Sequence, residues 1–112
     1  MQEAEENVMP QFGSPFSELA NSRKLTNKEL VRAIRFMVAA EYEATQMYVQ
    51  LAESTSNKLA AAVLKDIADE EIVHAGEFLK LLYELAPHEK ALYAKGAKEV
   101  EEIIKSQRQK TK

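Results

Sequence analysis

Residues Asp66–Phe78 read DIADEEIVHAGEF, and polar side chains here take positions that a helix usually gives to its core. Apolar residues recur at intervals of three and four on both sides, which predicts a helix over about residues 58–85. Glu71 and His74 lie on the apolar stripe of that helix. The other members of this stripe are Val63, Ile67, Phe78, Leu81 and Leu85.

A second apolar stripe precedes this helix and is interrupted in the same way. Thr26 and Glu29 form the pattern of a capping box, and no glycine or proline follows before the turn signal STSN at residues 54–57. The spacing predicts a helix over about residues 27–54, with Glu41 at the centre of its stripe. The apolar members of this stripe are Leu30, Ile34, Met37, Ala44, Tyr48 and Leu51.

The short connection between the two helices predicts an antiparallel hairpin. Glu41 and Glu71 both lie about 15 residues from the middle of the turn, so we expect them to face each other across the hairpin. A buried carboxylate without a partner is costly, and no Lys or Arg shares the stripes at this level. A bound cation is therefore the economical way to neutralise the two carboxylates.

Pro87 ends the second helix and suits the first turn of a third helix, predicted over about residues 88–106. The apolar face of this helix is thinner, and Gly96 lies inside it. No strand pattern appears, so the predicted fold class is all-α: a two-helix hairpin plus a shorter C-terminal helix. We expect an irregular N-terminal arm at 1–25, one helical domain at 26–106 and a flexible tail at 107–112.

The composition narrows the classes of function. The 112 residues suffice for one small domain, and a net charge of −3 gives no basic footprint for nucleic acid. No apolar run approaches the roughly 20 residues of a membrane span, and the acidic N-terminus does not resemble a signal peptide. The absence of cysteine excludes disulfides, thiolate metal sites and a cysteine nucleophile. We expect a cytoplasmic protein.

The spacing of Glu71 and His74 puts a carboxylate oxygen and an imidazole nitrogen on one helix face. Oxygen ligands with one imidazole suit iron or manganese, with zinc as a further candidate. With Glu41, one chain supplies half of the ligand set that a carboxylate-bridged di-iron site uses in a four-helix bundle. Two chains about a two-fold axis would complete the set, so we expect a homodimer with the site at its interface.

The segments AEYEATQMY (residues 40–48) and DEEIVHAGEF (69–78) resemble the encapsulated ferritins, a branch of the ferritin-like superfamily. The resemblance covers roughly residues 27–86. It implies a ferroxidase that oxidises Fe(II) to Fe(III) at a di-iron centre between two subunits. It further implies Glu41, Glu71 and His74 as iron ligands, Tyr48 as a tyrosine next to the ligands, and Glu43 as an acidic residue that helps bring metal to the site.

The resemblance also implies partners. Family members assemble as decameric rings of five dimers and rely on an encapsulin shell for mineral storage, which would place this chain inside an encapsulin nanocompartment. The sequence departs from the family at its C-terminus, because KSQRQKTK (105–112) does not resemble the small and apolar encapsulin-targeting peptide of many members. Either the sequence is trimmed before such a peptide, or docking lies elsewhere, with MPQFGSPF (9–16) as one candidate, or the chain is not cargo.

Other interpretations stay open at this point. Glu41 could be a surface residue, Glu70 could replace Glu71, and Glu77 could be an outer metal contact or a surface charge. The chain could also be a structural helical oligomer or cargo module, whose carboxylates hold Ca²⁺, Zn²⁺ or nothing. A third class comprises other ferritin-like carboxylate oxygenases and rubrerythrin-like peroxidases. The rubrerythrin form needs a cysteine-ligated rubredoxin domain, and this sequence has no cysteine.

Overall fold

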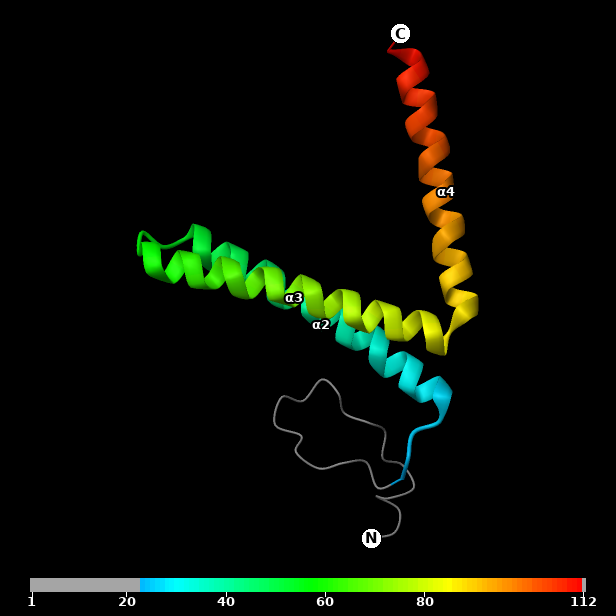
Figure 1. Cartoon of the computed structure of the whole chain (residues 1–112), viewed down its shortest axis with the longest axis horizontal. Helices are drawn as coiled ribbons and strands as arrows, with labels where there is room; N and C mark the ends of the chain where they lie inside the picture. The colour runs from blue at the N-terminus through cyan, green and yellow to red at the C-terminus, as the bar shows by residue number, and fades with distance from the viewer. Residues whose placement is uncertain (1–22, 112) are drawn as a thin grey trace.

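The structure is a computed structural model, and it describes residues 23–111 (Figure 1). Three helices follow one another: α2 (Asn27–Glu53), α3 (Lys58–Leu85) and α4 (Pro87–Lys110). There is no strand among the described residues, so the predicted all-α fold class is confirmed. Most of the predicted N-terminal arm, residues 1–22, lies outside the described part. The division of the chain at residues 26 and 106 stays a prediction.

The ends of α2 and α3 agree with the sequence prediction, whereas α4 differs. It continues to Lys110, four residues beyond the predicted end at Ser106. The added residues, Gln107–Lys110, read QRQK and contain no glycine or proline. Because Gln, Arg and Lys have high helix propensity, nothing in this segment stops the helix.

Helix α2 begins with the predicted capping box. The Thr26 hydroxyl accepts a hydrogen bond from the backbone N–H of Glu29 at 3.2 Å, and the Glu29 carboxylate accepts one from the backbone N–H of Thr26 at 2.9 Å. Arg23 also binds the Glu29 carboxylate, with N···O distances of 2.6 and 2.7 Å. The hydrogen bond from Arg23 and the one from the Thr26 backbone lower the pKa of Glu29 to about 2.

This cap predicts a stability that depends on pH. Since the pKa of Glu29 is lower in the folded chain than its ordinary value of 4.5, its stabilisation is complete above about pH 4.5 and is lost as the pH falls towards 2. We expect Glu29→Gln to lower the thermal midpoint at about pH 7 and to have much less effect at about pH 2.5. Thermal unfolding followed by circular dichroism checks this. An equal effect at both pH values would contradict the role of the Glu29 charge.

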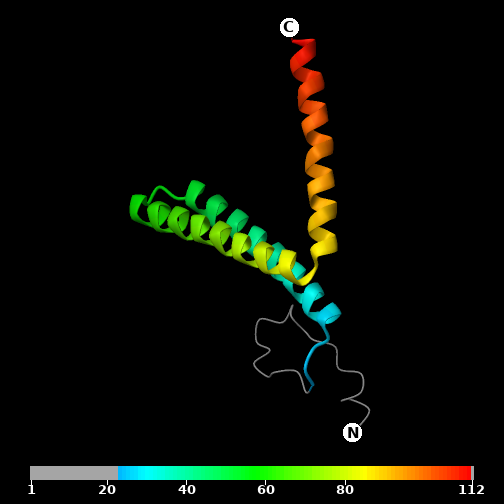
Figure 2. The ribbon, with the colours of Figure 1, turned by 45° about the vertical axis from the view of Figure 1, so that its right-hand side comes forward.

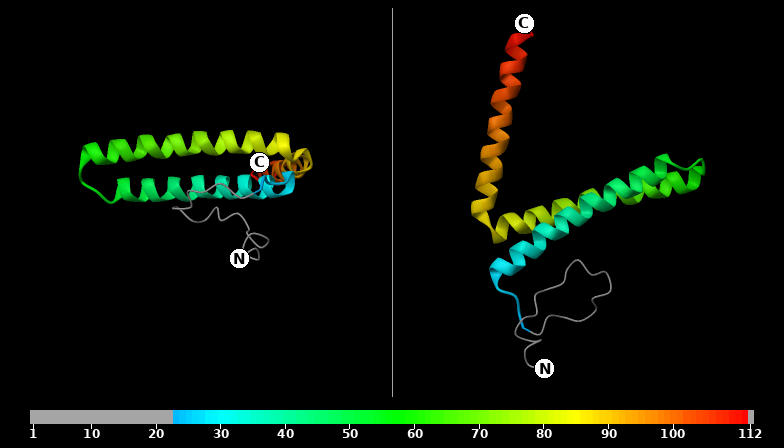
Figure 3. Two further views of the ribbon diagram at one scale, coloured as in Figure 1. Left: turned by 90° about the horizontal axis from the view of Figure 1, so that it is seen from below. Right: turned by 180° about the vertical axis from the view of Figure 1, so that it is seen from behind.

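Helices α2 and α3 lie side by side and antiparallel, joined by the turn at residues 54–57 (Figure 3). Their predicted pairing as a hairpin is confirmed. Small residues dominate the buried positions between them, which lets the two backbones approach closely. The buried residues are Ala33, Ile34, Val38, Ala52, Ala68, Ala75 and Leu82.

Several large residues of the predicted stripes lie beside this contact rather than within it. Leu51, Val63 and Leu81 are exposed in the single chain, because two helices alone cannot cover every apolar residue of the two stripes. At 100° per residue they project to the same side of the hairpin as His74. We call this surface the open face and define it by Met47 and Leu51 of α2 together with Val63, His74 and Leu81 of α3.

Helix α4 projects away from the hairpin (Figures 1 and 2). The joint is Ala86, with φ −137° and ψ 70°, a non-helical conformation in keeping with the clash that the following Pro87 would make with a helical one. None of the residues of α4 is buried. No helix in the described part of the chain has the length and apolar character needed to cross a membrane.

A small polar cluster holds the start of α4 against the hairpin. Arg35 of α2 binds the Glu89 carboxylate through Nε at 2.9 Å and through a second guanidinium nitrogen. The Tyr93 hydroxyl donates to the same carboxylate, and the Tyr93 ring lies 5.9 Å from that of Tyr83 on α3. The hydrogen bonds from Arg35 and Tyr93 hold the pKa of Glu89 below its ordinary value. We call Arg35, Glu89 and Tyr93 the clasp.

Candidate metal centre

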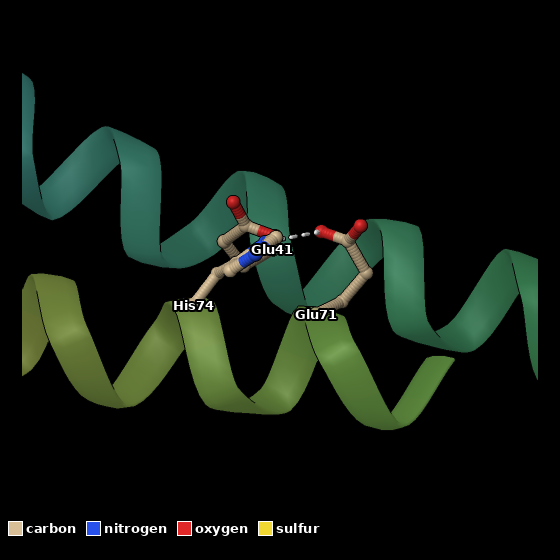
Figure 4. Close-up of side chains that lie close together, drawn as sticks. All are labelled: Glu41, Glu71 and His74. Atoms are coloured by element: carbon tan, nitrogen blue, oxygen red, sulfur yellow. Dashed lines mark ion pairs between the residues drawn. The ribbon is translucent and has the colours of Figure 1, made fainter. Parts of the chain in front are cut away.

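Three side chains with metal-ligating atoms converge midway along the hairpin (Figure 4). Glu41 comes from α2, and Glu71 and His74 come from α3. One ligand atom from each lies within 4.8 Å of the other two. Nδ1 of His74 is 3.8 Å from an oxygen of Glu41 and 3.7 Å from an oxygen of Glu71, both longer than a hydrogen bond. The three groups therefore surround a common point instead of binding one another directly.

The burial of this cluster is uneven. The side chains of Glu41 and Glu71 are each 18% exposed, whereas that of His74 is 48% exposed and reaches the open face. Oε2 of Glu41 is buried and has no hydrogen-bond partner. Within the described residues, neither carboxylate pairs with a Lys or Arg. A buried carboxylate oxygen without a donor fits a site that a cation completes.

The local sequence explains why the cluster forms midway along the hairpin. Glu71 and His74 are one helical turn apart, so both project from the same face of α3. Ala75, 2% exposed, packs directly beside them and lets α2 and α3 approach closely. The side chain of Glu41 can then reach across to α3. The hydroxyl of Thr45 donates to the backbone oxygen of Glu41 at 2.8 Å, a contact within the helix that sequence analysis missed.

The donor set fits iron chemically. Two carboxylates and one imidazole are hard or intermediate ligands, the combination that suits iron and manganese. One chain provides these three residues at one point, fewer than a di-iron site requires. The exposed side of His74 leaves the cluster accessible from the open face.

The remaining predicted residues occupy different environments. The structure brings Glu71 into the cluster and leaves Glu70 exposed outside it. Tyr48 is half-buried two turns after Glu41 and is not part of the cluster. Glu43 and Glu77 are exposed. The roles predicted for Tyr48 and Glu43 stay predictions.

Comparisons with known proteins identify the class of the domain. The rubrerythrin family model matches residues 15–110, so the chain belongs to this family of ferritin-like proteins. It is 41% identical over 98 residues to the encapsulin nanocompartment cargo protein EncC of Myxococcus xanthus, covering 88% of this chain and 73% of that protein. The predicted resemblance to encapsulated ferritins is confirmed.

Two proteins of Pyrococcus furiosus add to this assignment. A ferritin-like-encapsulin shell fusion protein is 35% identical over 78 residues, which is 70% of this chain and 23% of the fusion protein. The crystal structure of an encapsulated ferritin domain from the same organism superposes with a TM-score of 0.73 at 31% identity, covering 80% of this chain and 90% of that one. Rubrerythrin-type ferritin-like domains bind iron, in agreement with the donor set.

Proposed function

We propose that this protein is a ferroxidase, which oxidises Fe(II) to Fe(III) at a di-iron centre formed between two copies of the chain. The observation that carries the proposal is the convergence of Glu41, Glu71 and His74, with one Glu41 oxygen buried and without a donor. Membership of an iron-binding ferritin-like family supports iron over other cations.

The open face supports a site shared by two chains. Leu51, Val63 and Leu81 are exposed there around the half-exposed imidazole of His74. A second hairpin packed on this face would bury these apolar side chains and form a four-helix bundle. The two chains together would offer four carboxylates and two imidazoles, the ligand set of a carboxylate-bridged di-iron centre.

In this proposal Fe(II) is the substrate, and it gives up one electron per ion to O2 or peroxide. Glu41 and Glu71 hold the ions and neutralise their charge, and His74 supplies a nitrogen ligand that orients each one. Exposed Glu43 would attract Fe(II) towards the centre, and half-buried Tyr48 would line its far side. The chain offers no nucleophile at the cluster, and the reaction needs none.

The relatives suggest where the product goes. One is an encapsulin cargo protein and another is fused to an encapsulin shell. By analogy, dimers of this chain would assemble into a decameric ring and pass Fe(III) to an encapsulin compartment in the cytoplasm. Because bound Fe(II) neutralises the carboxylates at the interface, we expect metal to promote the dimer.

Fe(II) titration tests the proposal. Anaerobic protein receives Fe(II) and then air, and absorbance is followed at roughly 300–350 nm, where Fe(III)–oxygen species absorb. We expect oxidation well above the rate in buffer, saturating near one iron per chain, together with a rise in mass on loading. Binding of Ca²⁺ or Zn²⁺ without any accelerated Fe(II) oxidation would instead support a structural or cargo module.

A further inference from the structure

A pocket of about 350 Å³ lies at the end of the hairpin where α2 begins and α3 ends. Its volume is at the lower end of the range of about 300–1,000 Å³ that small-molecule sites occupy. None of its residues belongs to the metal cluster, which lies midway along the hairpin. The pocket is therefore large enough for a small ligand and separate from the candidate metal centre. The lining residues are Asn27, Lys28, Val31, Arg32, Arg35 and Leu85.

Three of the residues that line the pocket are basic. Lys28, Arg32 and Arg35 follow one another at intervals of four and three, so their side chains project from one face of α2. Arg35 binds the Glu89 carboxylate of the clasp. Between residues 23 and 111, neither Lys28 nor Arg32 forms an ion pair with a carboxylate. Two of the three cations are therefore not neutralised, although the whole chain has a net charge of −3.

This arrangement of charges works against the stability of α2. Lys28 lies in the first helical turn, where the helix dipole favours a negative charge and disfavours a positive one. Lys28 and Arg32 are four residues apart, a spacing at which like charges repel each other. The carboxylate of Glu29 in the same turn is already bound by Arg23 and by the backbone of Thr26. An anion bound in the pocket would relieve both unfavourable interactions.

The hydrogen-bond donors of the pocket indicate the chemical class of this anion. Lysine and arginine offer only N–H donors, and each guanidinium presents them in pairs that match the oxygens of a phosphate group. The backbone N–H groups of Asn27 and Lys28 have no carbonyl partner within the helix, and they favour the same ligand. A tetrahedral oxyanion can accept from several of these donors together. Because the pocket is larger than one phosphate ion, a diphosphate group also fits.

From these observations we infer that the pocket is an anion site, which binds phosphate or a diphosphate group through Lys28, Arg32 and Arg35. The inference goes beyond the proposed ferroxidase and does not rest on it, because none of these residues is a candidate metal ligand. Arg35 takes part in both the pocket and the clasp. The Glu89 carboxylate and the anion therefore compete for one guanidinium.

Calorimetric titration of the full, metal-free chain at low ionic strength tests the site. Inorganic phosphate and pyrophosphate serve as separate probes. We expect one anion per chain and a dissociation constant that rises with salt concentration, since salt screens the exposed charges. Equal affinity for the two probes assigns free phosphate as the ligand. Pyrophosphate that binds at least about tenfold more tightly assigns a diphosphate group, because its two phosphoryl groups can engage all three cations.

Two substitutions should change the affinity for phosphate in opposite directions. Arg32→Gln removes a guanidinium from the pocket and should raise the dissociation constant at least about fivefold. Glu89→Gln removes the competing carboxylate and should lower the dissociation constant severalfold. Arg108→Gln is the matched control, because Arg108 is an exposed arginine near the far end of α4, and it should have little effect. Circular dichroism verifies that each variant keeps its helices.

Thermal unfolding gives a second measure of the site. In phosphate-free buffer, Lys28→Gln should raise the midpoint, because it removes a cation from the first turn of α2. In saturating phosphate the unmodified chain should have the higher midpoint, since it binds the anion more tightly than the variant does.

The inference is overturned if neither probe binds saturably. It is also overturned if Arg32→Gln and Arg108→Gln weaken binding equally, because the effect would then come from the overall charge and not from the pocket. A Glu89→Gln variant that binds phosphate no more tightly would show that Arg35 does not bind the anion. All of these measurements use metal-free protein, so an absence of Fe(II) oxidation would contradict the proposed function alone.

Discussion

Glu41→Gln protein is expected to oxidise Fe(II) at least about 100-fold more slowly than the unmodified chain. Mutating a residue that only hydrogen-bonds to a metal ligand typically lowers metal affinity or activity by roughly 10–100-fold, so a direct ligand should have a larger effect. The amide keeps the size of the side chain but loses the charge that would hold Fe(II) against α2. The effect on the metal-free protein should have the opposite sign. Removing a charge whose buried oxygen has no donor should raise the free energy of unfolding by about 1 kcal/mol.

Stopped-flow oxidation and thermal unfolding of the metal-free protein measure the two effects. Glu53→Gln provides the matched control, because Glu53 is exposed at the end of the same helix. It should change neither the rate nor the unfolding midpoint appreciably. If the Glu41→Gln variant oxidises Fe(II) at the normal rate, Glu41 is not a ligand of the site, even if the stability of the variant rises as expected.

Leu81→Glu is expected to abolish the dimer and Fe(II) oxidation together. Leu81 is 42% exposed on the open face, seven residues from His74. Packing a second hairpin there would bury the new carboxylate without a partner, so we expect the dimer to weaken at least about 100-fold. If the centre needs ligands from two chains, the monomers would bind Fe(II) weakly and oxidise it slowly.

Ile72→Glu is the control for Leu81→Glu. Ile72 is 51% exposed and, two residues before His74, projects about 200° away from it around the helix. Native mass spectrometry, with circular dichroism to verify the helices, should show an intact dimer in this variant. A monomeric Leu81→Glu protein that oxidises Fe(II) at the full rate would show that one chain contains the whole centre.

Sequence patterns were sufficient for the hairpin but not for its packing. The caps of α2 and α3 come from short-range signals, Thr26 with Glu29 and Asn57, whose effects do not depend on the rest of the fold. Which face is buried depends on the partner helix. Alanines such as Ala68 and Ala75 occupy the contact, and larger residues such as Leu81 remain outside it. Periodicity alone did not separate these two adjoining faces.

The candidate site was predictable because its spacing is local on each helix and symmetric about one turn. Glu71 and His74 are one turn apart, and Glu41 lies at a matching distance from residues 54–57. Exposure was not predictable in the same way. Half of the His74 side chain is accessible, since the single chain covers only one side of the imidazole.

The position of α4 depends on contacts between residues distant in sequence. Arg35 and Glu89 are 54 positions apart, and neither belongs to a recognisable motif. Their ion pair, with Tyr93, holds α4 in one direction relative to the hairpin, beyond the non-helical joint at Ala86. Helix propensity predicted that α4 exists, but it does not encode this direction.

A small rotation at Ala86 produces a large displacement at the far end of α4. A helix of 24 residues reaches about 36 Å, so a tilt of about 10° at Ala86 moves its far end by roughly 6 Å. A small adjustment of the clasp would therefore cause a larger displacement of the residues near Ile103. The direction in which the far end of α4 points would then be set largely by one arginine, which is not a member of the Glu41, Glu71 and His74 cluster.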